Sequence, residues 1–374
     1  MKTVRIGIIG SGWISVTHME AFRALAGVKV VAQHSRDEIR AKAFCKAQGI
    51  PAHHSDLKEM LARKDIDAVT VSLPNSLHAP YALQAIRAGK HVIVEKPLCL
   101  TLAEADEMIA AAKKAGVIIG YAEELCYIPK FVRAKELADS GAIGDVFFVK
   151  QSEKHAGPYS PWFFQADLAG GGILMDMGCH AIEYCRWTLG KPAVKSVYCD
   201  LGLYSYAGMM ELDDHCVMII EFEGGKKALV ESSWTLKGGM ESRAEIHGTK
   251  GVIQTSLLQD GFGMKMFSEP GSAGDEDHAG KGWTHPGWAE NWQNGYPQEM
   301  QDFVNCIRNG GTPLESGIDG RVVLEIMIAG YLSAATGKRI DFPFKDPGGY
   351  KTPVEIWLKA RRKAARAVAK TKKA

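Results

Sequence analysis

The sequence has no cysteines in C-x-x-C spacing and no apolar run long enough to cross a membrane, although it contains eight cysteines and is 46% hydrophobic. It also has no pattern of an N-terminal signal peptide. Scattered cysteines without a targeting segment are typical of a reducing compartment. We therefore expect a soluble cytoplasmic protein, with no disulfide framework and no metal site.

An excess of charge of one sign is also missing. The 374 residues include 45 Lys and Arg against 43 Asp and Glu, so the formal net charge is +2. This balance gives no general attraction to nucleic acid or to a membrane surface. The exception is the basic, Ala-rich segment from Lys359 onward, for which a solvated helix end is favoured over a nucleic-acid contact.

A glycine-rich turn near the N-terminus is the first indication of function. Residues 4–9, VRIGII, are typical of a buried parallel strand, and GSGWIS (10–15) leads into a segment with helical spacing of apolar residues. A dinucleotide-binding turn requires this strand–turn–helix context. Gly10 allows the tight turn, Gly12 lets a pyrophosphate approach, and Trp13 and Ile14 begin the helix. The alternative is a glycine turn without a nucleotide.

The residues after the next strand pattern, VKVVAQH, predict which nucleotide is bound. NAD sites usually place Asp or Glu there, to accept hydrogen bonds from the ribose hydroxyl. This sequence has Ser35 and Arg36 instead. A guanidinium can donate two parallel hydrogen bonds to a 2′-phosphate. The sequence therefore favours NADP(H), with NAD(H) as the alternative.

Strand and helix patterns alternate up to residue 123, which predicts a doubly wound parallel sheet with ligands beyond the carboxyl ends of its strands. Two polar segments fall at such ends, LPNSLH (73–78) and EKP (95–97). We expect them to share a crevice with the glycine turn. A surface ion pair between Glu95 and Lys96 is the alternative to a role in chemistry.

The pattern changes in the second half of the chain. Short β-rich runs joined by Gly turns, such as EFEGGKKALVE (221–231), predict hairpins and so an antiparallel sheet. The segment 173–188 is typical of a helix with Asp176 and His180 on one face.

Two other groups of residues leave alternatives open. The three residues 213–215, Asp-Asp-His, favour the start of a strand over a metal site. A group of aromatic residues either stacks on sugar rings or packs the domains together: Trp283, Trp288, Trp292 and Tyr296.

Three stretches, in this order, resemble the Gfo/Idh/MocA oxidoreductases, the glucose–fructose oxidoreductase and inositol dehydrogenase family. They are GIIGSGWISVTHMEAF (7–22), VSLPNSLHAPYALQAIRAGKHVIVEKPL (71–98) and LAGGGILMDMGCHAIEYCRWTLG (168–190). The resemblance implies an α/β protein: an N-terminal Rossmann domain with a doubly wound parallel sheet, then an α/β domain with a large open, mostly antiparallel sheet. We place the domains at 1–123 and 124–345, with a C-terminal helix and tail at 346–374.

The resemblance also implies hydride transfer between NAD(P) and a secondary carbinol or keto carbon of a sugar, polyol, cyclitol or glycoside. It makes Lys96, Asp176 and His180 the catalytic residues. The residues expected around the nucleotide are Gly10, Gly12, Trp13, Ile14, Ser35, Arg36, Leu73, Asn75, His78, Glu95, Lys96 and Glu124. Those expected around the substrate are Lys96, Tyr159, Trp162, Asp176 and His180.

This chain departs from the family pattern at several of these positions. Glu124 and Cys126 stand where many members have Asn-x-Arg, and Trp162–Phe163 stands where Trp-Arg is frequent. Glu183 replaces a frequent Asp. The first two changes fall near the nicotinamide and the substrate, so they bear on substrate specificity.

The chemistry assigns roles to the three catalytic residues. With a pKa near ~6.5, His180 would accept the proton of the hydroxyl; a buried structural histidine is the alternative. Lys96 would stabilise the developing alkoxide, and its pKa would fall if it were desolvated. Asp176 would orient a neighbouring hydroxyl or the imidazole.

Two rival functions remain open on the sequence. One is an enzyme that keeps its nucleotide bound and shuttles hydride between two substrates. The other is a non-catalytic, nucleotide-binding regulator on the same fold, against which the presence of all three catalytic residues argues. We expect a small carbohydrate-like substrate, no nucleic-acid or membrane partner, and a homo-oligomer formed through the open sheet.

Overall fold

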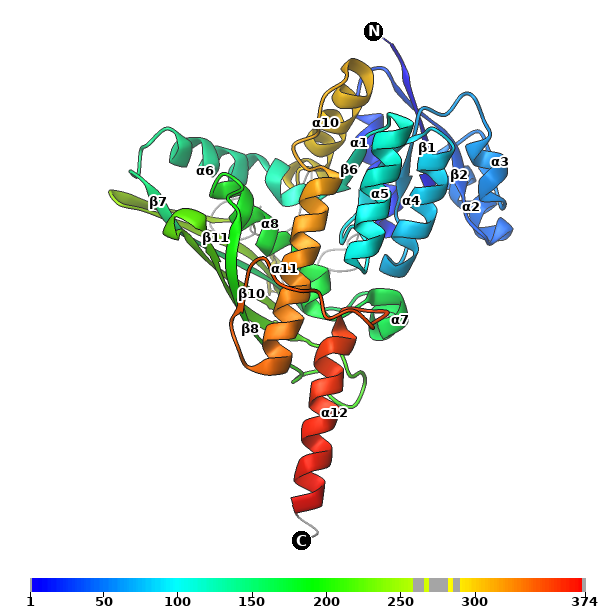
Figure 1. Cartoon of the computed structure of the whole chain (residues 1–374). Coiled ribbons are helices and arrows are strands. Elements are labelled where there is room, and N and C mark those ends of the chain that lie inside the picture. The colour runs from blue at the N-terminus through cyan, green and yellow to red at the C-terminus, as the bar shows by residue number, and fades with distance from the viewer. Residues whose placement is uncertain (1, 258–265, 269–281, 285–289, 372–374) are drawn as a thin grey trace.

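The computed structural model describes residues 2–257, 266–268, 282–284 and 290–371 (Figure 1). Its two main sheets lie side by side, with helices around the first and along one face of the second.

The first sheet is parallel and has six strands in the order β3-β2-β1-β4-β5-β6. The strands are β1 (Val4–Ile9), β2 (Val28–His34), β3 (His53–His54), β4 (Ala68–Val71), β5 (His91–Glu95) and β6 (Ile119–Ala122). The helices between them are α1 (Trp13–Arg23), α2 (Glu38–Gln48), α3 (Leu57–Leu61), α4 (His78–Arg87) and α5 (Leu102–Ala115). The central strands are buried and apolar because helices cover both faces of the sheet. The expected doubly wound sheet is confirmed.

The second sheet has seven strands in the order β12-β11-β7-β10-β9-β8-β15. They are β7 (Val146–His155), β8 (Val194–Gly202), β9 (His215–Phe222), β10 (Lys227–Ser233), β11 (Met240–Gly248), β12 (Gly251–Ser256) and β15 (Ile340–Asp341). Only the pair β7–β10 is parallel among these strands, so the mostly antiparallel sheet is confirmed, as is the β9–β10 hairpin. β13 (Met266–Ser268) and β14 (Gly282–Thr284) pair with each other in antiparallel fashion, apart from both main sheets.

Helices cover one face of the second sheet and leave the other open. α8 (Cys179–Thr188) packs on β7 and β10, and α11 (Gly317–Thr336) packs on β8. On the uncovered face Tyr198, Val217 and Ile219 are exposed. Shorter elements complete the chain: α6 (Pro129–Asp139), α7 (Ala166–Ala169), α9 (Glu290–Gln293), 3-10 turns at Asn75–Leu77, Glu124–Tyr127, Pro161–Phe164 and Glu223–Gly225, and a π-helical turn at Leu174–Gly178.

One late helix belongs to the core of the first sheet. α10 (Tyr296–Asn309) packs on α1, and its Phe303 is buried in one cluster with Ile6 and Phe22. A side chain at Gly120 of β6 would lie 2.7 Å from the Phe303 ring, so this close packing requires glycine there. Tyr296 is buried in the same cluster, which favours packing over sugar contact for that residue. Trp288 lies outside the described residues.

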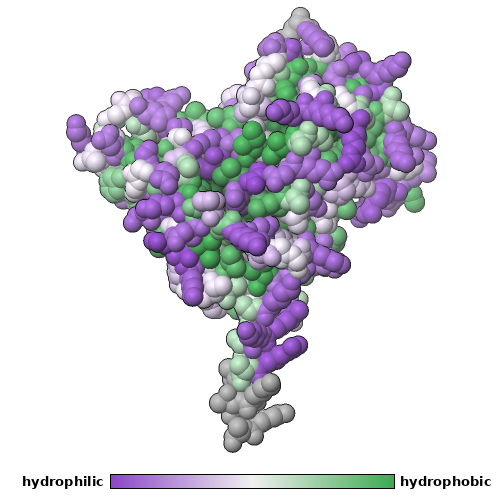
Figure 2. Space-filling model, in the orientation of Figure 1, coloured by the Kyte–Doolittle hydropathy of each residue, from purple (hydrophilic) through white to green (hydrophobic). Residues whose placement is uncertain are grey.

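The last helix, α12 (Val354–Thr371), is buried against the body through its first turns, and Arg362 further along forms an ion pair with Glu211. Val354, Trp357 and Leu358 are buried, whereas residues 361–367 are exposed. The helix projects from the body, and its visible side chains are mainly hydrophilic (Figures 1 and 2). This is the solvated basic helix end that the sequence favours. None of the described helices combines the length and hydropathy needed to cross a membrane.

Candidate active site

The glycine turn after β1 has the shape that a nucleotide pyrophosphate requires. Gly10 has φ +128°, and a side chain there would lie 2.3 Å from the carbonyl oxygen of Ser72. A side chain at Gly12 would meet nothing within 4 Å, so the approach to the first turn of α1 is open. No side chain caps this helix end, which leaves its N–H groups to bind an anion. Trp13 is exposed and Ile14 half-buried beside it. The turn therefore fits a dinucleotide.

The residues expected at the ribose follow β2. Ser35 is half-buried, and Arg36 is exposed with no ion pair to any residue in the described part of the chain. The next residue, Asp37, is the nearest acid in sequence, but its carboxylate accepts a hydrogen bond from the N–H of Arg40 and caps α2. The guanidinium is thus available, and one oxygen of the carboxylate is engaged in the helix cap.

His78 and Asn75 hold the loops of the site together. The ring nitrogens of His78 lie 2.7 and 2.8 Å from the carbonyl oxygens of Pro97 and Leu73, so the buried ring joins the ends of β5 and β4. His78 stays a predicted nucleotide residue, and both of its ring nitrogens face backbone carbonyl oxygens. The Asn75 amide donates to the carbonyl of Ala169, which ties this edge of the first sheet to α7.

Lys96 does not form a surface ion pair with Glu95. The Glu95 carboxylate is buried, lies 2.8 Å from His18 Nε2 and accepts the backbone N–H of Lys96. The ammonium of Lys96 instead donates to Asp176, at 3.0 Å to the carbonyl oxygen and 3.1 Å to Oδ1. The surface ion pair is therefore excluded, and the ammonium joins β5 to the segment before α8.

Asp176 and Lys96 keep each other charged. Burial alone would lower the pKa of Lys96, but the charge of Asp176 and smaller contributions from Glu124 and Glu95 together outweigh it, and the pKa is raised. Burial would likewise raise the pKa of Asp176, but Lys96 and His155 hold it far below its usual value. The expected fall in the Lys96 pKa is wrong, because the sequence did not show that a carboxylate would lie beside it. Lys96 is a permanent cation here.

His180 forms a buried dyad with Glu123, a residue the sequence analysis missed. His180 Nδ1 lies 2.6 Å from Glu123 Oε1, and Nε2 has no hydrogen bond within the described residues. Burial lowers the pKa of His180 to about 4, although the charge of Glu124 opposes this, so the expected pKa near ~6.5 is wrong. At neutral pH His180 is therefore uncharged, and the tautomer that donates Nδ1–H to the Glu123 carboxylate leaves Nε2 as a proton acceptor.

The position of Glu123 could have been found in the sequence. It directly follows β6, as Glu95 ends β5, and both lie at the carboxyl edge of the parallel sheet. Glu124 lies next to it, with Oε2 3.7 Å from His180 Nδ1. Burial raises the pKa of Glu124 to about 7.

The three glycines before α8 allow Asp213 to fix the start of the helical segment. A side chain at Gly172 would lie 1.8 Å from the carbonyl oxygen of Asp213. The Asp213 carboxylate accepts the N–H groups of Gly172 and Leu174 and the hydroxyl of Tyr331. The helix expected over 173–188 is α-helical only from Cys179, after the π-helical turn that contains Asp176. Asp213 is thus a helix cap that precedes β9.

The aromatic residues expected at the substrate form a layer next to Asp176. Tyr159, 73% exposed, stacks on His155 with ring centroids 4.7 Å apart. His155 Nε2 lies 3.5 Å from Asp176 Oδ2, which also accepts from Trp234 Nε1 at 2.9 Å. Trp162 stacks on Phe163, and Phe163 packs against Trp234. Tyr159 therefore contacts a residue that binds Asp176, namely His155. Trp162 reaches the other such residue, Trp234, through Phe163.

Other polar groups of α8 have structural partners. Glu183 accepts two hydrogen bonds from Arg186, 2.6 and 2.9 Å long, and so stabilises the helix. Glu123, Cys179 and His180 place potential metal-ligand atoms within 4.8 Å of one another. The hydrogen bond between His180 and Glu123 already uses two of these groups.

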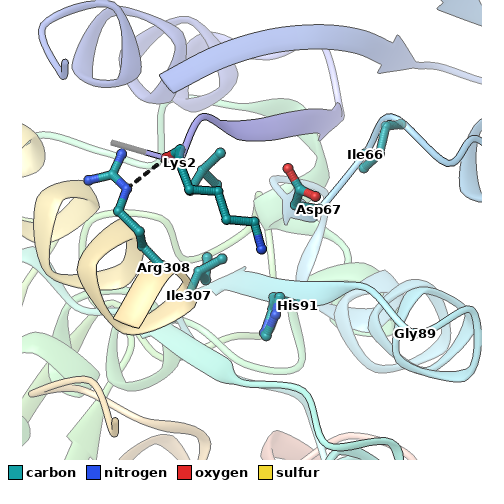
Figure 3. A pocket seen from close by; sticks show the side chains of 8 residues that line it. Lys2, Ile66, Asp67, Gly89, His91, Ile307 and Arg308 are labelled. Carbon is teal, nitrogen blue, oxygen red and sulfur yellow. Dashed lines mark hydrogen bonds between the residues drawn. The ribbon is translucent and has the colours of Figure 1, made fainter. Parts of the chain in front are cut away.

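A small polar hollow of about 170 Å³ lies at the opposite edge of the first sheet (Figure 3). Its lining residues are Lys2, Val4, Ile66, Asp67, Gly89, His91, Ile307 and Arg308. It adjoins the amino ends of β1 and β5, whereas the glycine turn and Lys96 adjoin carboxyl ends. The hollow is therefore separate from the site of Lys96 and His180.

A doubly wound sheet with an open glycine turn, a buried lysine–aspartate pair and a histidine–glutamate dyad at one edge defines a nucleotide-dependent oxidoreductase. The chain matches the model of the GFO/IDH/MocA oxidoreductase family, NAD-binding Rossmann fold, over residues 4–123, and that of the GFO/IDH/MocA C-terminal domain over residues 131–254. It belongs to this family of oxidoreductases.

Individual relatives align over nearly the whole chain. A scyllo-inositol 2-dehydrogenase (NAD(+)) of Bacillus subtilis is 29% identical over 345 residues, which cover 91% of this chain and 97% of that protein. The solved structure of GenD2 from gentamicin A biosynthesis, in complex with NAD, is 33% identical with a TM-score of 0.86, covering 92% of this chain and 97% of its own. Levoglucosan dehydrogenase, in complex with NADH and levoglucosan, is 26% identical with a TM-score of 0.78, covering 92% and 100%.

Proposed function

We propose that this protein is an NAD(P)-dependent dehydrogenase or reductase that transfers a hydride between the nicotinamide and a secondary carbinol or keto carbon of a sugar, polyol, cyclitol or glycoside. The observation that carries the proposal is the pairing of Lys96 with Asp176 beside the His180–Glu123 dyad, at the sheet edge that bears the glycine turn. Relatives that act on scyllo-inositol and levoglucosan support the substrate class.

The bound nicotinamide would supply the hydride acceptor, and the protein supplies the proton path. His180 Nε2 accepts the proton of the substrate hydroxyl while Nδ1 stays bound to Glu123. The Glu123 carboxylate then stabilises the imidazolium and fixes its orientation, as a carboxylate does behind a general-base histidine. Lys96 donates a hydrogen bond to the oxygen as negative charge develops there. Asp176 holds the ammonium charged and in place.

A panel of cyclitols, sugars, anhydrosugars and simple hydroxy acids, each assayed with NAD and with NADP, tests the proposal. Turnover of at least one carbohydrate-like compound is expected. Turnover of hydroxy acids alone would overturn the substrate class, and no turnover with any compound would favour the regulator. Nucleotide fluorescence in the freshly purified protein would indicate the rival enzyme, which keeps its nucleotide bound. Its absence would favour an enzyme that releases the nucleotide.

For the cofactor, we propose that NADP(H) binds more tightly than NAD(H), because Arg36 is exposed without an ion pair among the described residues, and one oxygen of the following Asp37 already caps α2. Arg36→Ala should narrow the difference between the two nucleotides by about 1–3 kcal/mol, the scale for losing a charged hydrogen bond. Fluorescence titration of both reduced nucleotides measures this, with Arg40→Ala, in the helix α2 that follows Arg36, as the charge control. Equal affinities in the unmutated protein would show that Arg36 does not select the nucleotide.

We propose that the uncovered face of the second sheet forms a homo-oligomer, since Tyr198, Val217 and Ile219 expose apolar surface there. Sedimentation should then give a mass of at least twice the 40.7 kDa of one chain, and Ile219→Glu should lower it toward one chain. A monomeric unmutated protein would contradict this.

For location, we propose the cytoplasm. All eight cysteines are free, and the sulfur atoms of Cys199 and Cys216 lie 3.7 Å apart as thiols. A reducing compartment keeps such neighbouring thiols from oxidising.

A further inference from the structure

One strand of the second sheet lines the site of His180 and Asp176. Gln151, Glu153 and His155 alternate along β7 and are buried on the face that α8 covers. His155, at the end of this row, lies 3.5 Å from Asp176 Oδ2. The charges of Glu123 and Glu124 act on Glu153. This row of β7 side chains therefore lies along the site, with His155 next to Asp176 and Glu153 nearer to the His180–Glu123 dyad.

Two carboxyl groups of this site have no basic side chain of their own. Glu95 faces His18, Asp176 faces Lys96, and Glu123 faces His180. Within the residues that the structure describes, Glu153 has only neutral donors, the Ser242 hydroxyl at 2.6 Å and the Gln151 amide. Glu124 lies 3.7 Å from His180 Nδ1, the atom that Glu123 already occupies.

Unsatisfied acceptors lie next to these two carboxyl groups. Gln151 is fully buried, and its Oε1 has no hydrogen-bond partner in the described structure, while its amide group points at Glu153. Oε2 of the fully buried Glu123, beside Glu124, also lacks a partner among the described residues. Buried acceptors without donors are costly, so the site calls for a ligand rich in donors.

We propose that Glu153 and Glu124 receive the ammonium group of an amino-substituted sugar or cyclitol, which is the substrate class of this site. The proposal rests on the proposed function. An ammonium group brings three donors, no acceptor and a positive charge, and so satisfies carboxylates that a neutral hydroxyl would leave uncompensated. Burial raises the pKa of Glu153 to about 8, and the acids around it add to this. A cation in the site would oppose both effects and ionise the group.

Paired compounds that differ only in the amine test the proposal: D-glucosamine against D-glucose, and scyllo-inosamine against scyllo-inositol. With saturating nucleotide at pH 7, kcat/KM should be about 10–100-fold higher for the amino member of at least one pair, the scale of a charged hydrogen bond. Glu153→Gln should lower the amino-to-hydroxyl ratio about 10-fold or more. Glu107→Gln is the matched control, because Glu107 lies exposed on α5 and pairs with Arg87, and it should leave the ratio unchanged.

Calorimetric titration of the amino compounds into the NADH-bound protein measures their binding without turnover. It therefore separates failure of the ammonium site from failure of the proposed function. Turnover of the hydroxyl compounds equal to or better than that of the amino compounds, or a ratio that Glu153→Gln leaves unchanged, would overturn the ammonium site alone. Binding of an amino compound that Glu153→Gln weakens, without turnover of any compound, would support the ammonium site and overturn the proposed function. Neither binding nor turnover of the amino compounds would overturn the ammonium site.

Discussion

Replacing His180 with alanine is expected to lower kcat by about 10²–10⁴, the range for removing a general base. The reason is its position: Nδ1 is held by Glu123, which leaves Nε2 to accept the proton of the substrate hydroxyl. Stopped-flow measurement of nucleotide reduction gives the rate directly. A near-normal kcat in this variant would show that proton transfer takes place elsewhere.

The pH dependence gives a second measurement on the same residue. Burial lowers the His180 pKa from 6.5 to about 4, so the neutral, proton-accepting form is kept as the pH falls and is lost only near pH 4. The acid limb of kcat/KM for alcohol oxidation should therefore lie well below 6.5 and should disappear in His180→Ala. Glu123→Gln should lower kcat/KM about 10–100-fold. It should also change the pH of the acid limb, because the carboxylate bound to the imidazole is lost. An acid limb near 6.5 in the unmutated protein would contradict the buried dyad.

Lys96→Ala is expected to lower kcat by about 10²–10³, as for the loss of one donor to a developing oxyanion. The nucleotide affinity should change little, because the ammonium is bound to Asp176 rather than to the glycine turn. The control is Lys113→Ala, which removes the same charge from an exposed position near the end of α5, away from the site. Because Lys96 and His180 act on one hydroxyl, the double variant should lose less than the sum of the two single losses. A normal kcat in Lys96→Ala would exclude it from the chemistry.

The order of the elements could be predicted because local patterns determine it. The apolar run of β1 and the turn that only Gly10 can form predict the dinucleotide fold without knowledge of distant contacts. The hairpin β9–β10 follows in the same way from alternation around a glycine turn. The placement of α10 could not be predicted, because Phe303 and Ile6 are nearly 300 residues apart and their contact depends on the tertiary fold.

In the site, too, local patterns could be predicted and long-range contacts could not. Glu95 and Lys96 could be assigned to the carboxyl edge of the sheet from their position after an apolar strand. Their partners could not, because His18 and Asp176 come from elements far apart in the sequence, and these partners decide the ionisation of both groups. The pKa of His180 depends on burial beside Glu123. Sequence patterns locate such groups, but the surrounding charges set their protonation.

The return of α10 to the first sheet also restricts how the enzyme can move. The chain leaves this sheet after β6, comes back to it with α10, and passes along β6 again at Ser316 before α11 enters the second sheet. Because the chain crosses between the two halves several times, we expect the halves to bend rather than to swing apart as domains on one flexible linker do. Exchange of the nucleotide would therefore depend on rearrangement of the loops at the strand ends, with the scaffold staying closed around the reaction.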